Sequence, residues 1–344
     1  MPSTLPQYTR TLDDSFVSTW YEIREEAIDN ILSATVIWNA LMGAGCFTDQ
    51  VGGEIITRTI GFGRGTAAQR VAKGSVMVPG EPTLDTMAIF NWKYMAGNIQ
   101  RSAFDDQKNN GPFKIKDYVG RRITAGRDEL EQSFETDVID VFQAAETNRI
   151  LSLNDMIPPV ANRTTGTYGG IQRPGSYIAE PNGVFVPNPA DVNPWWGPKY
   201  LPGVLATIDT DLLDDLKKLY NALHKNQVAP NLILTTQTIF EIYETFAIDI
   251  SQIIKDETTR LADLGFEVLR FKGKPVIWAD GVSAGTVFML NTDWIEFVYD
   301  PEFWFDMTDC KPGGAFEFDR AAQIVCAGNL ISTQLRRHGR LDYT

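Results

Sequence analysis

Histidine and cysteine are scarce in this sequence. Among 344 residues there are two histidines and three cysteines. The cysteines, Cys46, Cys310 and Cys326, are far apart and odd in number, so we expect no disulfide framework and favour a reducing compartment. No group of cysteines and histidines has the spacing of a zinc site. The sequence therefore predicts neither a metal site nor a cofactor.

Long apolar runs and an excess of basic residues are also missing. No apolar run approaches the roughly 18 residues that span a bilayer, so we expect no membrane association. The first ten residues lack the pattern of a signal peptide, which favours the cytoplasm. The chain has 31 basic and 44 acidic residues, a net charge of −13, whereas nucleic-acid binders carry basic faces. It is not built to bind DNA sequence-specifically.

The N-terminal third combines a helical pattern with a hairpin pattern. Apolar residues in steps of three and four predict a helix from Asp13 or Asp14 to about Met42, after an irregular arm. Alternation predicts strands at 54–60 and 87–95, joined by a glycine-rich stretch. A hairpin of this length has too little core to be stable alone. We expect it to be completed by another surface, in this chain or in a neighbouring subunit.

The rest of the chain predicts mixed helix and strand, and hence an α+β class. A second long helix is expected at 117–145, and short strands with extended turns in the proline-rich region 150–205. Thr210 is expected to cap a helix that runs to about Lys225, and Thr236 to cap another. The expected strands are 231–234, 266–270, 275–278, 286–290, 295–299 and 323–335.

Sequence segments in the C-terminal half resemble those of the major capsid proteins of tailed bacteriophages, which have the Hong Kong 97-like shell fold. The residues that carry this resemblance are Pro230 to Tyr243, Phe271 to Asp280, and Gly285 to Thr292. The order of elements along nearly the whole chain agrees with the same family. The resemblance implies a structural subunit and not an enzyme.

The resemblance also implies a division of the chain. The implied parts are an N-terminal arm and helix (1–50), an extended hairpin loop (51–102), a peripheral domain with a long spine helix (103–160), an axial domain (161–314) and a return strand to the peripheral domain (315–344).

The implied function is self-assembly into hexamers and pentamers of an icosahedral phage head that encloses double-stranded DNA. The expected location is the virion capsid, after assembly in the host cytoplasm. The implied partners are other copies of the chain, a portal protein, a separate scaffolding protein, decoration proteins and packaged DNA. The nearest alternative is an encapsulin-like compartment, which uses the same fold to enclose an enzyme.

Charge distribution suggests how subunits could contact one another. The loop 51–102 has six basic and three acidic residues, whereas 128–140 has six acidic residues and no basic one. We hypothesise that the basic loop docks on the acidic helix of a neighbour, because opposite patches fix register. The alternative is that both are solvated faces. The residues of this hypothesis are Arg58, Arg64, Arg70, Lys73, Asp128, Glu131 and Glu135.

Three tryptophans are further candidates for contact between subunits. Trp195 and Trp196 lie in the proline-rich region, and Trp92 lies on the expected hairpin. Aromatic residues concentrate at interface hot spots. Burial within the chain is the alternative for all three.

One motif favours an enzyme instead. Gly281 to Gly285 fits the G-x-S-x-G nucleophile elbow around Ser283, with Asp306 and His338 in hydrolase order. The elbow needs a helix after the serine, but the following residues predict a strand. A turn between two strands is the simpler interpretation, and a serine hydrolase remains a remote alternative.

Overall fold

The computed structural model describes residues 36–63, 72–74, 83–102, 118–145, 147–225, 227–249, 269–307, 311–312 and 319–344. Within these, residues of 96–132 and 305–325 form a smaller compact unit, and the others form a larger one. The expected helix before residue 36 and the candidate residues Arg64 and Arg70 lie outside the described residues.

Helices and strands are mixed along the chain, in agreement with the α+β class. The helices are α2 (Val36–Gly43), α4 (Tyr118–Ile139), α5 (Leu153–Met156), α6 (Ile208–Leu223) and α7 (Gln237–Asp249), with 3-10 turns η1 (Val160–Asn162), η2 (Leu205–Thr207), η3 (Thr292–Trp294) and η4 (Leu335–Arg337). The strands are β1 (Phe47–Asp49), β2 (Ile55–Gly61), β3 (Asp85–Asn91), β4 (Lys93–Ser102), β5 (Thr167–Tyr168), β6 (Ile171–Gln172), β7 (Tyr177–Ala179), β8 (Phe185–Pro187), β9 (Lys199–Gly203), β10 (Leu232–Thr235), β11 (Leu269–Phe271), β12 (Lys274–Trp278), β13 (Thr286–Leu290), β14 (Ile295–Met307), β15 (Lys311–Pro312), β16 (Asp319–Ser332) and β17 (Gly339–Tyr343).

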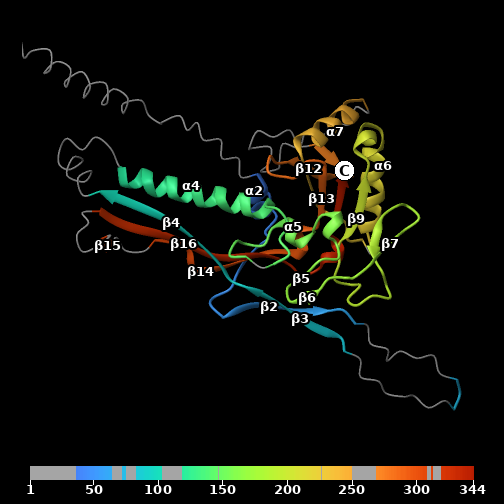
Figure 1. The fold of residues 1–344 in the computed structure, drawn as a ribbon, viewed down its shortest axis with the longest axis horizontal. Helices are drawn as coiled ribbons and strands as arrows, with labels where there is room; N and C mark the ends of the chain where they lie inside the picture. Colours follow the sequence, from blue (N-terminus) through green and yellow to red (C-terminus); the bar gives the residue numbers. More distant parts are fainter. Residues whose placement is uncertain are drawn as a thin grey trace, which may run out of the picture. The chain divides into compact units, whose positions relative to one another are not determined.

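An eight-stranded mixed sheet organises the larger unit. Its strand order is β11-β12-β10-β13-β17-β9-β8-β7. Strand β17 lies between β13, to which it is antiparallel, and β9, to which it is parallel. Helix α6 lies against one face of this sheet (Figure 1). Its apolar stripe of Leu212, Leu216 and Leu219 packs in one core cluster with sheet residues such as Met289 and Leu341. Burial of these side chains fixes the helix on the sheet.

The opposite face of this sheet holds a buried ion pair. Arg340 Nε of β17 lies 2.6 Å from Asp342 Oδ1, and both side chains are almost fully buried. Arg340 Nη1 also donates to Asn154 Oδ1 (2.5 Å) and to the carbonyl oxygen of Ile157 (3.1 Å). The second carboxylate oxygen of Asp342 accepts the backbone N–H of Val160 (3.1 Å). The pair therefore ties β17 to the segment around α5.

A second, five-stranded sheet has the order β1-β14-β16-β15, with β4 also beside β16. In the larger unit, an aromatic cluster is centred on Trp38 of α2. Its ring stacks on Phe134 of α4 (centroid distance 5.1 Å) and meets Phe47 and Phe297 edge-on at 5.0 and 4.9 Å. These geometries are the favoured ones for aromatic pairs, so the cluster fixes α2 against α4 and β14.

Several local predictions are confirmed. Helix α2 ends at Gly43, strand β10 leads into α7, and β13 follows the turn at 281–285. Between the expected strands 266–270 and 275–278, Lys272 and Gly273 join β11 to β12 as a two-residue loop, and both residues have positive φ, 50° and 78°. Positive φ at both positions matches the right-handed twist of a hairpin.

Other boundaries differ from the sequence-based expectation. The expected strand 87–95 is two strands, because the chain leaves β2 at Trp92 and continues as β4 in the other sheet. Helix α4 ends at Ile139 and not at 145. The reason is that Asn154 Nδ2 donates to the carbonyl oxygens of Ile139 and Asp140, satisfying groups that a longer helix would use.

Two further differences concern the second half of the chain. Helix α6 begins at Ile208, directly after η2, so Thr210 lies in its first turn and donates to the carbonyl oxygen of Thr207. The expected strand 323–335 ends at Ser332, and β17 then enters the eight-stranded sheet. The described residues 319–344 therefore hold two strands that belong to different sheets, and the division of the chain into parts stays a prediction.

Candidate functional site

Strands β2 and β3 form a two-stranded ribbon with two different faces. Ile55 pairs with Asn91 and Gly61 with Asp85 in an antiparallel register. One face is buried and consists of Ile56, Ile60, Ala88 and Phe90. The other face exposes the apolar side chains of Ile55, Met87 and Ile89, which are 37%, 54% and 44% accessible. An exposed apolar face on a ribbon with little core of its own indicates a contact surface.

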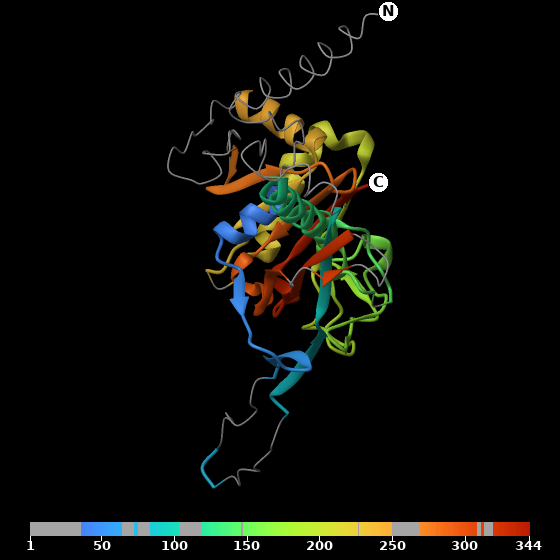
Figure 2. The same cartoon turned by 90° about the vertical axis from the view of Figure 1, so that its left-hand side faces the viewer.

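The ribbon lies beside the β5–β6 hairpin (Figures 1 and 2), and its buried face contacts that hairpin. The backbone N–H of Ile89 donates to the carbonyl oxygen of Gly169 (3.0 Å), and the ring of Phe90 meets Tyr168 edge-on at 5.3 Å. Gly169 has a φ of +59°, and a Cβ there would lie 2.7 Å from Phe90. Glycine is therefore required at this turn. The expectation that another surface completes the hairpin is confirmed for this face, and that surface belongs to the same chain.

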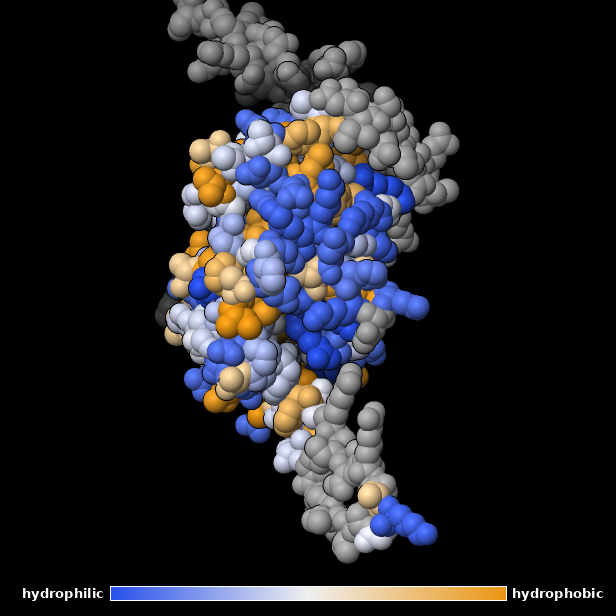
Figure 3. All heavy atoms as spheres, turned by 90° about the vertical axis from the view of Figure 1, so that its right-hand side faces the viewer, coloured by the Kyte–Doolittle hydropathy of each residue, from blue (hydrophilic) through white to orange (hydrophobic). Residues whose placement is uncertain are grey.

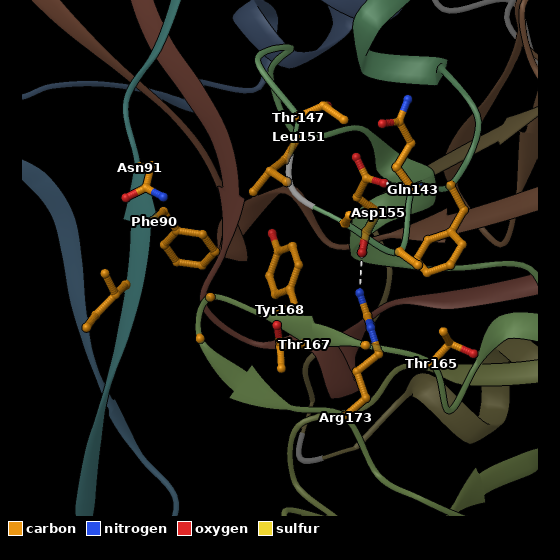
Figure 4. Close-up of a pocket in the computed structure, with 17 residues that line it drawn as sticks. Phe90, Asn91, Gln143, Thr147, Leu151, Asp155, Thr165, Thr167, Tyr168 and Arg173 are labelled. Carbon is orange, nitrogen blue, oxygen red and sulfur yellow. Dashed lines mark hydrogen bonds between the residues drawn. The ribbon is translucent and has the colours of Figure 1, made fainter.

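A cavity of about 110 Å³ lies at the root of the ribbon, between β3, the loop after α4 and the β5–β6 hairpin (Figure 4). Arg173 on its wall is buried and donates to the carbonyl oxygens of Met156 (3.3 Å) and Asp155. Its Nε has no hydrogen-bond partner. The carboxylate of Asp155 pairs with Arg149 (2.8 Å). The cavity is polar and large enough for several water molecules.

The basic residues predicted to contact a neighbour occupy different environments. Arg58 forms an ion pair with Glu296 (2.8 Å) and donates to Gln50 Oε1 (3.2 Å), so its charge is compensated within the chain. Lys73 is exposed. Arg64 and Arg70 lie outside the described residues. Among the described candidates, Lys73 alone presents an uncompensated basic side chain.

The acidic residues of α4 also divide into two kinds. Asp128 is exposed, and the pKa of Glu131 is raised by partial burial and by the neighbouring Asp128 charge. Glu135 is buried, and its carboxylate accepts the backbone N–H groups of Ile37 (2.9 Å) and Trp38 (2.7 Å). Burial raises the pKa of Glu135 although these hydrogen bonds oppose the shift. Its prediction as a surface contact is therefore corrected: Glu135 binds the N-terminus of α2.

The three candidate tryptophans are largely held within the chain. Trp196 is fully buried and donates from Nε1 to the carbonyl oxygen of Tyr168 (2.9 Å), so its prediction as an interface residue is wrong. Trp92 is buried, and its Nε1 donates to the carbonyl oxygen of Gly53 (2.8 Å). Trp195 is half-buried and stacks on Phe62 at 4.9 Å. Contact with another subunit remains a prediction for Trp195.

The hydrolase alternative lacks its geometry. Ser283 lies in the turn before strand β13, so no helix follows it. His338 is fully buried. Its Nδ1 accepts the backbone N–H of Asn291 (3.3 Å), which leaves the ring proton on Nε2, 2.9 Å from Ser332 Oγ. The ring of His338, just before β17, therefore bonds to Ser332 at the end of β16 and to Asn291 just after β13.

Acid is expected to destabilise the chain through His338. Burial lowers the pKa of His338 from 6.5 to about 3, so between these values the unfolded state binds a proton that the folded state excludes. The stability that follows from keeping His338 neutral is fully present above pH 6.5 and is lost as the pH falls towards 3. From pH 7 to pH 5 the expected loss is about 2 kcal/mol, measured by urea unfolding at both pH values. Replacement of the exposed His224 by Gln should leave this loss between pH 7 and pH 5 unchanged; disappearance of the loss in His224→Gln would contradict the assignment to His338.

Within the described ranges, no three His, Cys, Asp or Glu side chains are placed to hold a metal ion. No helix among these residues is long and apolar enough to cross a membrane.

Sequence comparison and structure comparison give different results. No protein-family model matches the sequence, and no curated protein matches it. Among solved structures, the capsid of cyanophage A-1(L) aligns with a TM-score of 0.63 at 17% identity, over 93% of this chain and 95% of that one. The capsid of cyanophage P-SCSP1u aligns with a TM-score of 0.54 at 13% identity, over 93% and 91%.

A cellular shell protein gives a similar alignment. The SrpI encapsulin of Synechococcus elongatus aligns with a TM-score of 0.52 at 11% identity, over 92% of this chain and 91% of that one. The fold of this chain is therefore the Hong Kong 97-like fold of phage capsid proteins, as predicted, which this encapsulin shares.

Proposed function

We propose that the chain is the major capsid protein of a tailed phage and assembles into hexamers and pentamers of an icosahedral shell around double-stranded DNA. The exposed apolar face of the ribbon, formed by Ile55, Met87 and Ile89, carries this proposal. The opposite face of the ribbon is fixed on the β5–β6 hairpin of the same chain, so this apolar face points away from the chain and a second copy can cover it. The likeness to phage capsids over more than nine tenths of the chain supports the same function.

The proposed partners follow from this role. They are further copies of the chain, a portal protein, a separate scaffolding protein, decoration proteins and DNA bound without sequence preference. The spine helix would be α4, and the extended loop would be the ribbon with the residues between its strands. The proposed location is the virion capsid.

Electron microscopy of the purified full-length chain, alone and with a scaffolding candidate, tests the function. Closed shells or isolated hexamers and pentamers are expected. In the variant Ile89→Glu, a charge on the exposed face should prevent assembly while leaving the monomer folded, because the side chain of Ile89 is already exposed. The control is Ile178→Glu, at an apolar residue of β7 with a similar exposure of 43%. A wild-type chain that stays monomeric under all conditions would contradict the proposal.

The alternative is an encapsulin-like compartment, which the likeness to SrpI supports. The contents of shells isolated from the natural source distinguish the two functions. DNA supports the phage capsid, and an enclosed protein supports the compartment.

A further inference from the structure

Four basic side chains from distant parts of the sequence converge at the C-terminal end of α6. They are Lys199 of β9, Lys225 after α6, and Arg336 and Arg337 of η4; we name them the basic cluster. Lys199 Nζ donates to the carbonyl oxygen of Ala222, in the last turn of α6. Arg337 Nη1 donates to the carbonyl oxygen of Lys225 (2.9 Å). These two contacts place the cluster at the end of the helix.

The basic cluster has no carboxylate partner among the described residues. None of its members forms an ion pair there, although the charge of Glu180 acts on Lys199 and partly offsets the lowering of its pKa. Burial and the charges of Lys225 and Arg337 lower the pKa of Lys199 to about 8. Burial and the charge of Arg336 lower the pKa of Arg337. Lys199 is buried, whereas Lys225 and Arg336 are exposed and Arg337 is half-buried. In a chain of net charge −13 these exposed cations form a local basic patch that an anionic surface can cover.

The other end of α6 presents acidic side chains. Asp209, Asp211 and Asp214 are exposed at the start of the helix, and we name them the acidic end. Asp214 pairs with Lys218, whereas Asp209 and Asp211 have no ion pair among the described residues. The positive N-terminal end of the α6 dipole stabilises these negatively charged side chains. The negative end of the same dipole favours cations near the C-terminus of α6, so the dipole supports both charged groups.

The two groups cannot neutralise each other within one chain. Helix α6 has 16 residues, which corresponds to a length of about 24 Å. This exceeds the screening length of about 8 Å at physiological salt. Figure 3 views the molecule from the side on which α6 lies in Figure 1, and hydrophilic side chains gather over the centre of that face. Opposite charges at the two ends of one exposed helix therefore remain available to other molecules.

We infer that the basic cluster of one copy receives the acidic end of α6 from the next copy, which joins neighbouring subunits head to tail. The contact uses two different patches of the same compact unit, so it repeats from copy to copy and closes into a ring when the rotation allows. Charge complementarity selects a second copy as the partner, because both patches are present on every chain. The inference rests on the proposed assembly into rings of subunits and adds the contact that sets their order.

Charge reversal and charge exchange test the contact. The base reversal is Lys225→Glu with Arg336→Glu, and the acid reversal is Asp209→Lys with Asp211→Lys. Each is expected to lower the fraction of chain in assemblies about tenfold, because like charges then face each other. The fourfold variant that combines both reversals should restore assembly. Sedimentation and negative-stain microscopy measure the assembled fraction, and circular dichroism verifies that each variant is folded.

A second fourfold variant controls for net charge. It combines the base reversal with Asp280→Lys and Glu302→Lys, two exposed acids outside the acidic end, and should remain unassembled. Normal assembly of the base reversal, or equal rescue by this control, overturns the inference. Base-reversal shells that form normally but retain less nucleic acid would overturn it too, since the cluster would then face DNA. A wild-type chain that never assembles overturns the proposed function, and the inference with it.

Discussion

Replacement of Arg340 by methionine is expected to lower the free energy of unfolding by about 4 kcal/mol, because it leaves a buried carboxylate without its cation. Asp342 lies 2.6 Å from the guanidinium, and both side chains are almost inaccessible. Methionine fills much of the same space but donates no hydrogen bond. Asn154 and the carbonyl oxygen of Ile157 would also lose their donor.

Urea unfolding of the unassembled chain at pH 7 measures this loss. The matched control is Arg336→Met, which removes an exposed cation four residues earlier and should change the unfolding midpoint little. Equal effects of the two substitutions would show that the buried pair adds nothing specific. In that case β17 would be held by its neighbouring strands alone.

Replacement of Glu135 by alanine is expected to cost about 3 kcal/mol. The backbone N–H groups of Ile37 and Trp38 would both lose their acceptor in a buried environment, at about 1–3 kcal/mol for each group. Removing Glu135 also removes the cost of burying its carboxylate, which is why burial raises its pKa, and this gain offsets part of the lost hydrogen-bond energy. Thermal and urea unfolding measure the change.

Two further variants separate the hydrogen bonds from the charge. Glu135→Gln keeps one acceptor oxygen and should lose less stability than Glu135→Ala. Asp128→Ala removes an exposed acid from the same helix and should have little effect. If Asp128→Ala were as destabilising as Glu135→Ala, general loss of acidic charge on α4 would be responsible and not the contact with α2.

Local patterns predicted many elements because they depend on neighbouring residues. The turn at Lys272 and Gly273 and the strand before Thr236 follow from turn chemistry and capping. Which strands pair with each other cannot be predicted from such local patterns. Alternation in 87–95 indicated extended structure but could not show that the chain changes sheets at Trp92, which depends on contacts with distant residues.

The candidate site was predictable to a similar extent. The hairpin and its need for a further surface followed from its small core, and one face is now seen to rest on the β5–β6 hairpin. Glu135 and Trp196 were interpreted as surface contacts because residue type alone suggests exposure for glutamate and interface for tryptophan. Their partners are backbone groups 97 and 28 residues away, which no local pattern reveals. The basic cluster was missed for the same reason, since its members become neighbours only in the folded chain.

The position of β17 has a consequence for the order of folding. Strands β9 and β13 are separated by β17, whose residues 339–343 pair with 199–203 on one side and 286–289 on the other. During synthesis, residues 199–203 emerge long before this partner. The eight-stranded sheet therefore cannot be completed until residue 343 has left the ribosome, and contacts over some 140 residues close slowly. Until then β9 and β13 each present an unpaired edge, so a chaperone that shields such edges should raise the yield of folded subunits.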